Sequence, residues 1–170
     1  MRLAPRRLFA GAALTLALSV GTVAGPALAA DPSPDPVGIQ RASMGDVLPD
    51  TAPGLRMGLW EVIIPVGETA PPHVHLGYQI VYLTAGTLGY HIISGEAEVH
   101  RADGTVEPVT TGDTFELNVG DWLIESPGME HEAWNSGDTE VRNLAATLFP
   151  DGAPLSVAVN VESVAPSPAP

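Results

Sequence analysis

The sequence has 170 residues, no cysteine and no lysine, and a formal net charge of −13 at pH 7. This length suits one domain with a substantial core and is too short for two. The absence of cysteine excludes disulfides and thiolate ligands, and the negative charge disfavours nucleic acid and anionic membranes as partners.

Residues 1–29 have the pattern of a secretory signal peptide. Arg2, Arg6 and Arg7 precede an apolar run that ends in Ala-Leu-Ala at 27–29, the small-x-small pattern of a cleavage site. Glycines and a proline within the run disfavour a membrane anchor. The arginine pair fits a twin-arginine export signal as well as an ordinary Sec signal. We therefore expect a secreted or extracytoplasmic protein with no membrane association after cleavage, and the export route stays open.

Residues 30–53 are rich in Pro, Asp and Ser, which predicts a mostly disordered linker with one candidate strand around 39–47. Residues 54–150 form the expected domain, and 151–170 are expected to hold a strand remnant and a Pro-rich tail. Within the domain, short apolar or alternating runs are separated by Gly, Asp, Asn and Pro, which is typical of strands and turns. The candidate strands are 56–64, 79–84, 88–93, 97–101, 106–110, 114–117, 122–125, 132–135 and 141–148.

So many short strands in about a hundred residues predict an all-β domain, either a sandwich or a closed barrel. A small barrel has an interior that can hold one ligand. We therefore looked for side chains that could bind a ligand from inside.

Histidines occur at spacings that suit a metal ion. His73 and His75 lie two residues apart, so in an extended chain they face the same side. Alone, such a pair indicates a partly exposed polar pair as readily as a metal site. A strand at 122–125 leads into a Pro-Gly turn that delivers His131 at the start of the next strand. A third imidazole on a rigid element favours metal binding.

These residues complete a pattern that resembles the cupins. The first cupin motif, G-x5-H-x-H-x3-E-x6-G, is matched in spacing by Gly67, His73, His75, Gln79 and Gly86. Two spaced motifs together are far more specific than either alone.

The second cupin motif, G-x5-P-x-G-x2-H-x3-N, is matched by Gly120, Gly128, His131 and Asn135. Ser126 stands in place of its proline, and the stretch between the motifs is long enough for an added hairpin. The resemblance covers about residues 55–149 and implies a single cupin-type antiparallel β-barrel, or jelly-roll.

The resemblance implies one divalent ion held by His73, His75, His131 and Gln79, which replaces the usual glutamate and can coordinate through its carbonyl oxygen. Without a carboxylate the ion keeps its full charge, which strengthens Lewis-acid chemistry and makes an oxidised trivalent state costlier. Mn, Fe, Zn and Ni all remain open. The opposing interpretation is a decayed, metal-free site that binds a small molecule.

The function that follows is an exported cupin that acts on a small polar substrate by Lewis-acid chemistry, with its catalytic residues unknown. Because cupins include dioxygenases, isomerases, lyases and cyclases, the reaction stays open, as does catalysis itself. The alternatives are a non-catalytic metal or small-ligand binding protein and an iron-dependent dioxygenase. A homodimer through barrel strands is a further expectation. His91 and His100 are interpreted as surface or packing residues. Glu125, Glu130 and Glu132 flank His131, so one of them is a candidate acid or base, although most acidic residues here are expected to be solvated.

Overall fold

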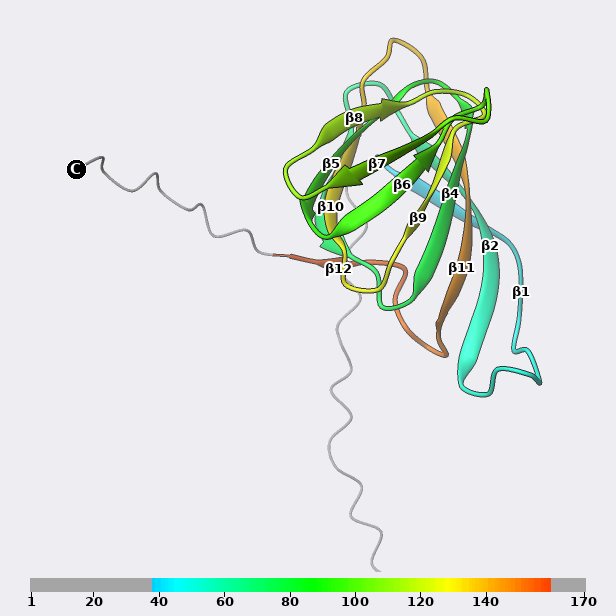
Figure 1. Cartoon of the computed structure of the whole chain (residues 1–170). Helices are drawn as coiled ribbons and strands as arrows, with labels where there is room; N and C mark the ends of the chain where they lie inside the picture. Colours follow the sequence, from blue (N-terminus) through cyan, green and yellow to red (C-terminus); the bar gives the residue numbers. More distant parts are fainter. Residues whose placement is uncertain (1–37, 160–170) are drawn as a thin grey trace, which may run out of the picture.

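The computed structural model describes residues 38–159, which form twelve strands in two antiparallel sheets (Figure 1). The predicted signal peptide, the first part of the predicted linker and residues 160–170 lie outside this range. No helix that could cross a membrane occurs in the described part of the chain. The strands are β1 (Gln40–Val47), β2 (Leu55–Ile64), β3 (Thr69–Val74), β4 (Tyr78–Ala85), β5 (Leu88–Ser94), β6 (Glu96–His100), β7 (Val106–Thr110), β8 (Thr114–Leu117), β9 (Trp122–Glu125), β10 (Glu130–Asn135), β11 (Val141–Pro150) and β12 (Val157–Ala158).

The seven-stranded sheet has the order β1-β2-β11-β4-β9-β6-β7, and the five-stranded sheet has the order β12-β3-β10-β5-β8. Figure 1 shows the two sheets curving around a common interior. The predicted all-β jelly-roll barrel is therefore confirmed. Strands that are neighbours in a sheet come from distant parts of the sequence, so each sheet depends on long-range pairing.

Alternation along each strand decides which side chains enter the barrel. In β11, every second residue is buried, from Val141 through Ala145 to Phe149. In β4, Val81 and Leu83 are buried, whereas Tyr78, Ile80 and Tyr82 are 54%, 40% and 43% exposed on the outer face. Successive side chains of a strand point to opposite faces of its sheet, so the burial pattern fixes the register.

Two strands lie where the sequence gives weak strand patterns. β1 occupies the candidate strand within 30–53 and pairs with β2 along its length, and Ile39 just before it is buried. β3 contains Pro71 and Pro72, which cannot donate to a ladder and disfavour a strand in sequence terms. The structure pairs β3 with β10 at Ala70 and His73, which leaves the prolines between the paired positions.

A buried ion pair fastens the added hairpin β6–β7 to the rest of the barrel. Asp121, 3% exposed, accepts hydrogen bonds from the backbone N–H groups of Ala102 and Asn118, both at 2.9 Å. Arg101 donates to the same carboxylate at 2.9 Å and also to Glu107. Burial opposes the charged form of Asp121, but these hydrogen bonds and the guanidinium outweigh it and lower the pKa of its carboxyl.

We predict that Asp121→Ala lowers the free energy of unfolding by about 2–3 kcal/mol, because it leaves buried donors without an acceptor. Glu107→Gln, which removes only the exposed partner of Arg101, should cost less than about 1 kcal/mol. Urea denaturation followed by tryptophan fluorescence measures both. The lowered pKa adds a pH signature: the contribution of Asp121 is complete above its ordinary pKa of about 3.9 and is lost as pH falls through the folded-state value. Equal losses in the two variants would contradict this assignment.

Candidate metal centre

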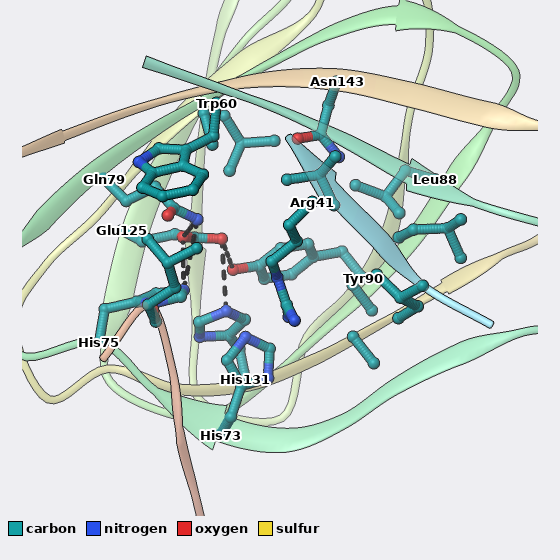
Figure 2. Close-up of a pocket in the computed structure, with 18 residues that line it drawn as sticks. Arg41, Trp60, His73, His75, Gln79, Leu88, Tyr90, Glu125, His131 and Asn143 are labelled. Carbon is teal, nitrogen blue, oxygen red and sulfur yellow. Dashed lines mark hydrogen bonds and ion pairs between the residues drawn. The ribbon is translucent and has the colours of Figure 1, made fainter. Parts of the chain in front are cut away.

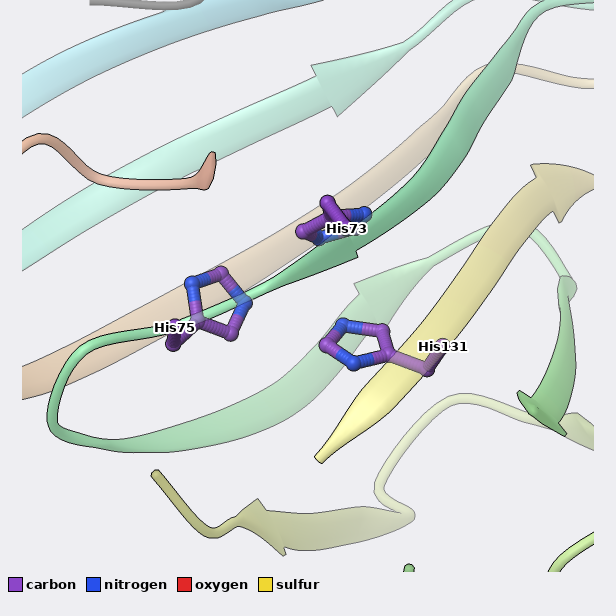
Figure 3. A group of neighbouring side chains, drawn as sticks. All are labelled: His73, His75 and His131. Atoms are coloured by element: carbon purple, nitrogen blue, oxygen red, sulfur yellow. The ribbon is translucent and has the colours of Figure 1, made fainter. Parts of the chain in front are cut away.

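Three imidazoles, from the adjacent strands β3 and β10 and from the connection after β3, lie close together (Figure 3). His73 on β3 and His131 on β10 are directly opposite in the register, and His75 follows one residue after β3 ends. Their ring centroids are 4.3–5.2 Å apart, and one potential ligand atom from each lies within 4.8 Å of the others. The structure thus brings together the three histidines that the sequence spacing selected.

Each imidazole is held in place by a backbone carbonyl. The Nδ1 atoms of His73, His75 and His131 lie 2.8, 2.5 and 3.1 Å from the carbonyl oxygens of Pro71, Leu155 and Met129. A carbonyl only accepts, so Nδ1 carries the proton in each ring and donates it. The three Nε2 atoms are left as the ligand atoms, the arrangement that backbone hydrogen bonds impose on metal-binding histidines.

The turn before His131 also holds the first motif in place. The Gly128 N–H donates to the carbonyl of His75 at 3.0 Å, and Gly128 has a positive φ of 79°. A residue with a side chain rarely adopts that conformation, which explains glycine here. The two motifs, far apart in sequence, are therefore bonded through their backbones next to the histidines.

The three histidines are buried. His131, His75 and His73 are only 1%, 4% and 9% exposed. For His73, burial and then the neighbouring His131 and His75 lower the pKa to about 3. His73 is therefore a neutral imidazole at ordinary pH, as a metal ligand must be.

A carboxylate completes the cluster. Glu125 on β9 is 2% exposed, and its Oε2 and Oε1 atoms lie 3.0 Å from His75 Nε2 and 3.3 Å from His131 Nε2. Gln79 donates its amide N–H to Oε2 at 2.6 Å, and the Tyr90 hydroxyl donates to Oε1 at 2.7 Å. Figure 2 shows these four groups gathered around the carboxylate.

The charges within the cluster depend on one another. Burial opposes ionisation of Glu125, but His131 and His75 outweigh it and hold the pKa of the carboxyl well below its ordinary value. Burial likewise opposes the protonated form of His131, and the carboxylate of Glu125 more than offsets it and raises the pKa of His131. Burial and then Glu125 raise the pKa of Tyr90, so its hydroxyl stays a donor. The ionised carboxylate of Glu125 and a positive charge beside it therefore stabilise each other.

Sequence reasoning placed Glu125 among acidic residues that are mostly solvated, whereas the structure buries it at the centre. A usable pattern was present: in β9, Leu123 and Glu125 share the inward phase of the alternation. An acidic residue at an inward position of a barrel strand indicates a paired or metal-bound carboxylate. Gln79 lies at the centre as expected, where its amide nitrogen contacts Glu125, and its role as a metal ligand stays a prediction.

The remaining candidate residues lie outside the three-histidine group. His91 pairs with Glu132 at 3.0 Å, and His100 stacks on Trp122 with ring centroids 3.7 Å apart. Glu130 is half-buried on β10, one residue before His131.

A cavity of about 60 Å³ adjoins the cluster (Figure 2). Its walls are largely apolar, with Trp60 and Ala145 among the lining side chains. Arg41 from β1 points into it toward His131, and Asn143 lies on the same wall. A space of this size admits a ligand of a few heavy atoms in contact with the histidines.

No family model matches the sequence, and no curated protein matches it. What decides the fold is the chain's own strand order, in which the strands of the two motifs lie side by side: β3 is next to β10 in one sheet, and β4 is next to β9 in the other. The barrel is an antiparallel jelly-roll of two sheets. The fold that the two motifs implied is thus the fold that the structure has.

Similar solved structures include an oxalate decarboxylase from Lactobacillus farciminis, with a TM-score of 0.42, 17% identity and coverage of 61% of this chain. This chain spans 26% of that decarboxylase. The polyketide cyclase RemF from Streptomyces resistomycificus gives a TM-score of 0.43 and 19% identity over 76% of this chain and 77% of that one. A double-stranded β-helix protein from Klebsiella pneumoniae gives 0.35 and 23% identity over 75% and 90%.

We predict that Gly77→Ala destabilises the protein by about 1–3 kcal/mol, as overpacking does. Gly77 lies between His75 and Gln79, and a Cβ there would be 2.2 Å from the carbonyl oxygen of Leu148, a backbone atom that cannot turn away. Gly137→Ala is the matched control, because its Cβ meets nothing nearer than 3.7 Å. Urea unfolding of both variants tests this, and similar midpoints for the two would contradict it.

Proposed function

We propose that this protein binds one divalent metal ion through the Nε2 atoms of His73, His75 and His131 and uses it on a small polar substrate. The single observation that carries the proposal is that all three Nδ1 atoms are bonded to backbone carbonyls, which leaves three Nε2 lone pairs converging in a buried interior. Neutral imidazoles with one nitrogen fixed by a hydrogen bond are the commonest protein ligands for such ions.

The fourth protein ligand would come from the pair formed by Gln79 and Glu125. Gln79, the oxygen ligand that the motif spacing predicted, lies within the cluster, with its amide nitrogen 3.3 Å from His75 Nε2. Imidazole and oxygen donors together suit Mn, Fe, Zn and Ni. Soft ions that prefer thiolates would find no cysteine in the chain.

The ion, when bound, supplies a Lewis acid that polarises a substrate oxygen. The chain supplies the surroundings: the apolar cavity wall limits water, and the histidines fix the position of the ion. The Tyr90 hydroxyl, held as a donor by Glu125, keeps a proton beside the centre. Charge development in a buried site of this kind, next to oriented donors, is stabilised more strongly than in water.

A non-catalytic protein that holds a metal or a small ligand is the second candidate, and the small size of the cavity favours it. Substrate turnover separates it from an enzyme. Oxygen uptake by the iron-loaded protein separates an iron-dependent dioxygenase from Lewis-acid chemistry. We further propose export, on the pattern of residues 1–29, and a homodimer through the outer face of β4, where Tyr78, Ile80 and Tyr82 are exposed.

We predict that His75→Ala and His131→Ala each abolish stoichiometric metal binding, because each removes an Nε2 ligand. His91→Ala is the matched control, since His91 pairs with Glu132 outside the cluster. Elemental analysis of purified protein and titration calorimetry with Mn²⁺, Fe²⁺, Zn²⁺ and Ni²⁺ measure content and affinity. Unchanged metal content in both cluster variants would overturn the proposal.

A further inference from the structure

The carboxylate missing from the first motif is present on the neighbouring strand. The cupin-like spacing places its acidic position at residue 79, which here is glutamine. In the seven-stranded sheet, Gln79 on β4 is the direct register partner of Glu125 on β9. Side chains directly opposite on antiparallel strands project from the same face at neighbouring positions. A carboxylate at 125 therefore reaches nearly the same part of the interior as one at 79.

The contacts of the Glu125 carboxylate with the two neighbouring imidazoles are favourable only when a cation lies between them. His75 and His131 each donate their Nδ1 proton to a backbone carbonyl. Their Nε2 atoms nevertheless face Glu125 oxygens, at 3.0 Å for His75 and 3.3 Å for His131. A lone pair on Nε2 facing a carboxylate oxygen is repulsive. The repulsion becomes attraction when a proton sits on each Nε2, or when one divalent ion lies between the rings and the carboxylate.

The other two partners of the carboxylate are arranged as positioning groups. Tyr90 is buried and stacks on His131, with ring centroids 5.1 Å apart and an interplanar angle of 9°. Tyr90 and Gln79 each donate one hydrogen bond, to different oxygens of Glu125. Hydrogen-bonded ligand carboxylates are typical of metal centres, because the bonds fix their orientation. Gln79 contacts the carboxylate through nitrogen, which is a donor and not a metal ligand.

We propose that Glu125 is the carboxylate ligand of the metal ion and that Gln79 is a positioning residue that orients it. This inference rests on the proposed three-histidine site. It assigns a ligand set of three imidazoles and one carboxylate, with the acidic ligand moved across one pair of strands. The carboxylate would then compensate one positive charge of the ion. An oxidised trivalent state is therefore less costly than at a site whose fourth ligand is a neutral glutamine.

Exchange of the two residues tests this assignment. Glu125→Gln should weaken Zn²⁺ and Mn²⁺ binding at least tenfold, measured by competition with a chromophoric chelator. The double variant Gln79→Glu with Glu125→Gln restores the carboxylate from the other strand and should recover most of the affinity. Gln79→Leu keeps the ligand and should weaken binding less than Glu125→Gln. Far-ultraviolet circular dichroism and urea unfolding report whether each variant is folded.

A crystal structure of the metal-loaded wild-type protein gives a test that needs no variant. We expect a Glu125 oxygen at about 2.0–2.2 Å from the ion. Glu125 outside coordination distance, or Glu125→Gln with unchanged affinity, would overturn the assignment. If His75→Ala also left metal binding intact, the three-histidine site itself would be wrong, so the two failures are distinguishable.

A second inference concerns the ligand, and a different residue carries it. Arg41 reaches the cavity from β1 and points toward the histidines, while the wall beside it is largely apolar (Figure 2). Its guanidinium stays charged even though burial lowers its pKa. A planar fork of donors matches a carboxylate in two parallel hydrogen bonds.

We infer that the cavity takes a small carboxylate, with its charged group on Arg41 and another oxygen toward the histidines. The inference deepens the proposed function and depends on it. The cavity volume of about 60 Å³ restricts the ligand to a few heavy atoms. Arg41 therefore selects for charge, and the cavity wall selects for size.

Glycolate and its uncharged amide, glycolamide, are suitable probes with the metal-loaded protein in calorimetry. Glycolate should bind the wild-type protein, and Arg41→Gln should weaken it at least tenfold while leaving metal content unchanged. Arg41→Lys should recover part of the affinity. Arg56→Gln, a change at an exposed arginine, should have no effect. Glycolamide bound as tightly as glycolate, no glycolate binding, or equal binding by Arg41→Gln would each overturn the inference, and a loss of metal content would point to the metal site instead.

Discussion

The carboxylate of Glu125, buried between His75 and His131, is the interaction on which the rest of the centre depends. A charged group with 2% exposure is stable only where opposite charge and hydrogen bonds surround it. Here both oxygens have two partners each, drawn from β4, β5, β10 and the loop after β3.

Two cross-strand pairs, one in each sheet, supply this arrangement. His73 and His131 are partners in the five-stranded sheet, and Gln79 and Glu125 are partners in the seven-stranded sheet. Curvature of the sheets brings the pairs face to face, and His75 bridges them from the connection between β3 and β4. Because side chains alternate along strands, a slip of one residue in either register would turn a pair outward.

Periodicity and motif spacing were enough for the barrel, ten of its strands and the three histidines, since these depend on local patterns and fixed intervals. The alternation in β9 marks Glu125 as inward-facing, but its place beside Gln79 follows from the pairing of β4 with β9, which no local pattern encodes. β3 was obscured by Pro71 and Pro72. The contact that fixes the His75 ring could not be predicted, because it is made by the backbone carbonyl of Leu155 and does not depend on the identity of that side chain.

The segment after β11 has a consequence for the order of assembly. Leu155 and β12 follow the other strands in synthesis, yet Leu155 sets the ring of His75, and β12 pairs with β3 beside His73. On a growing chain, the earlier strands can pair before the imidazoles are fully oriented. The affinity for an ion would then rise only when this segment closes against β3.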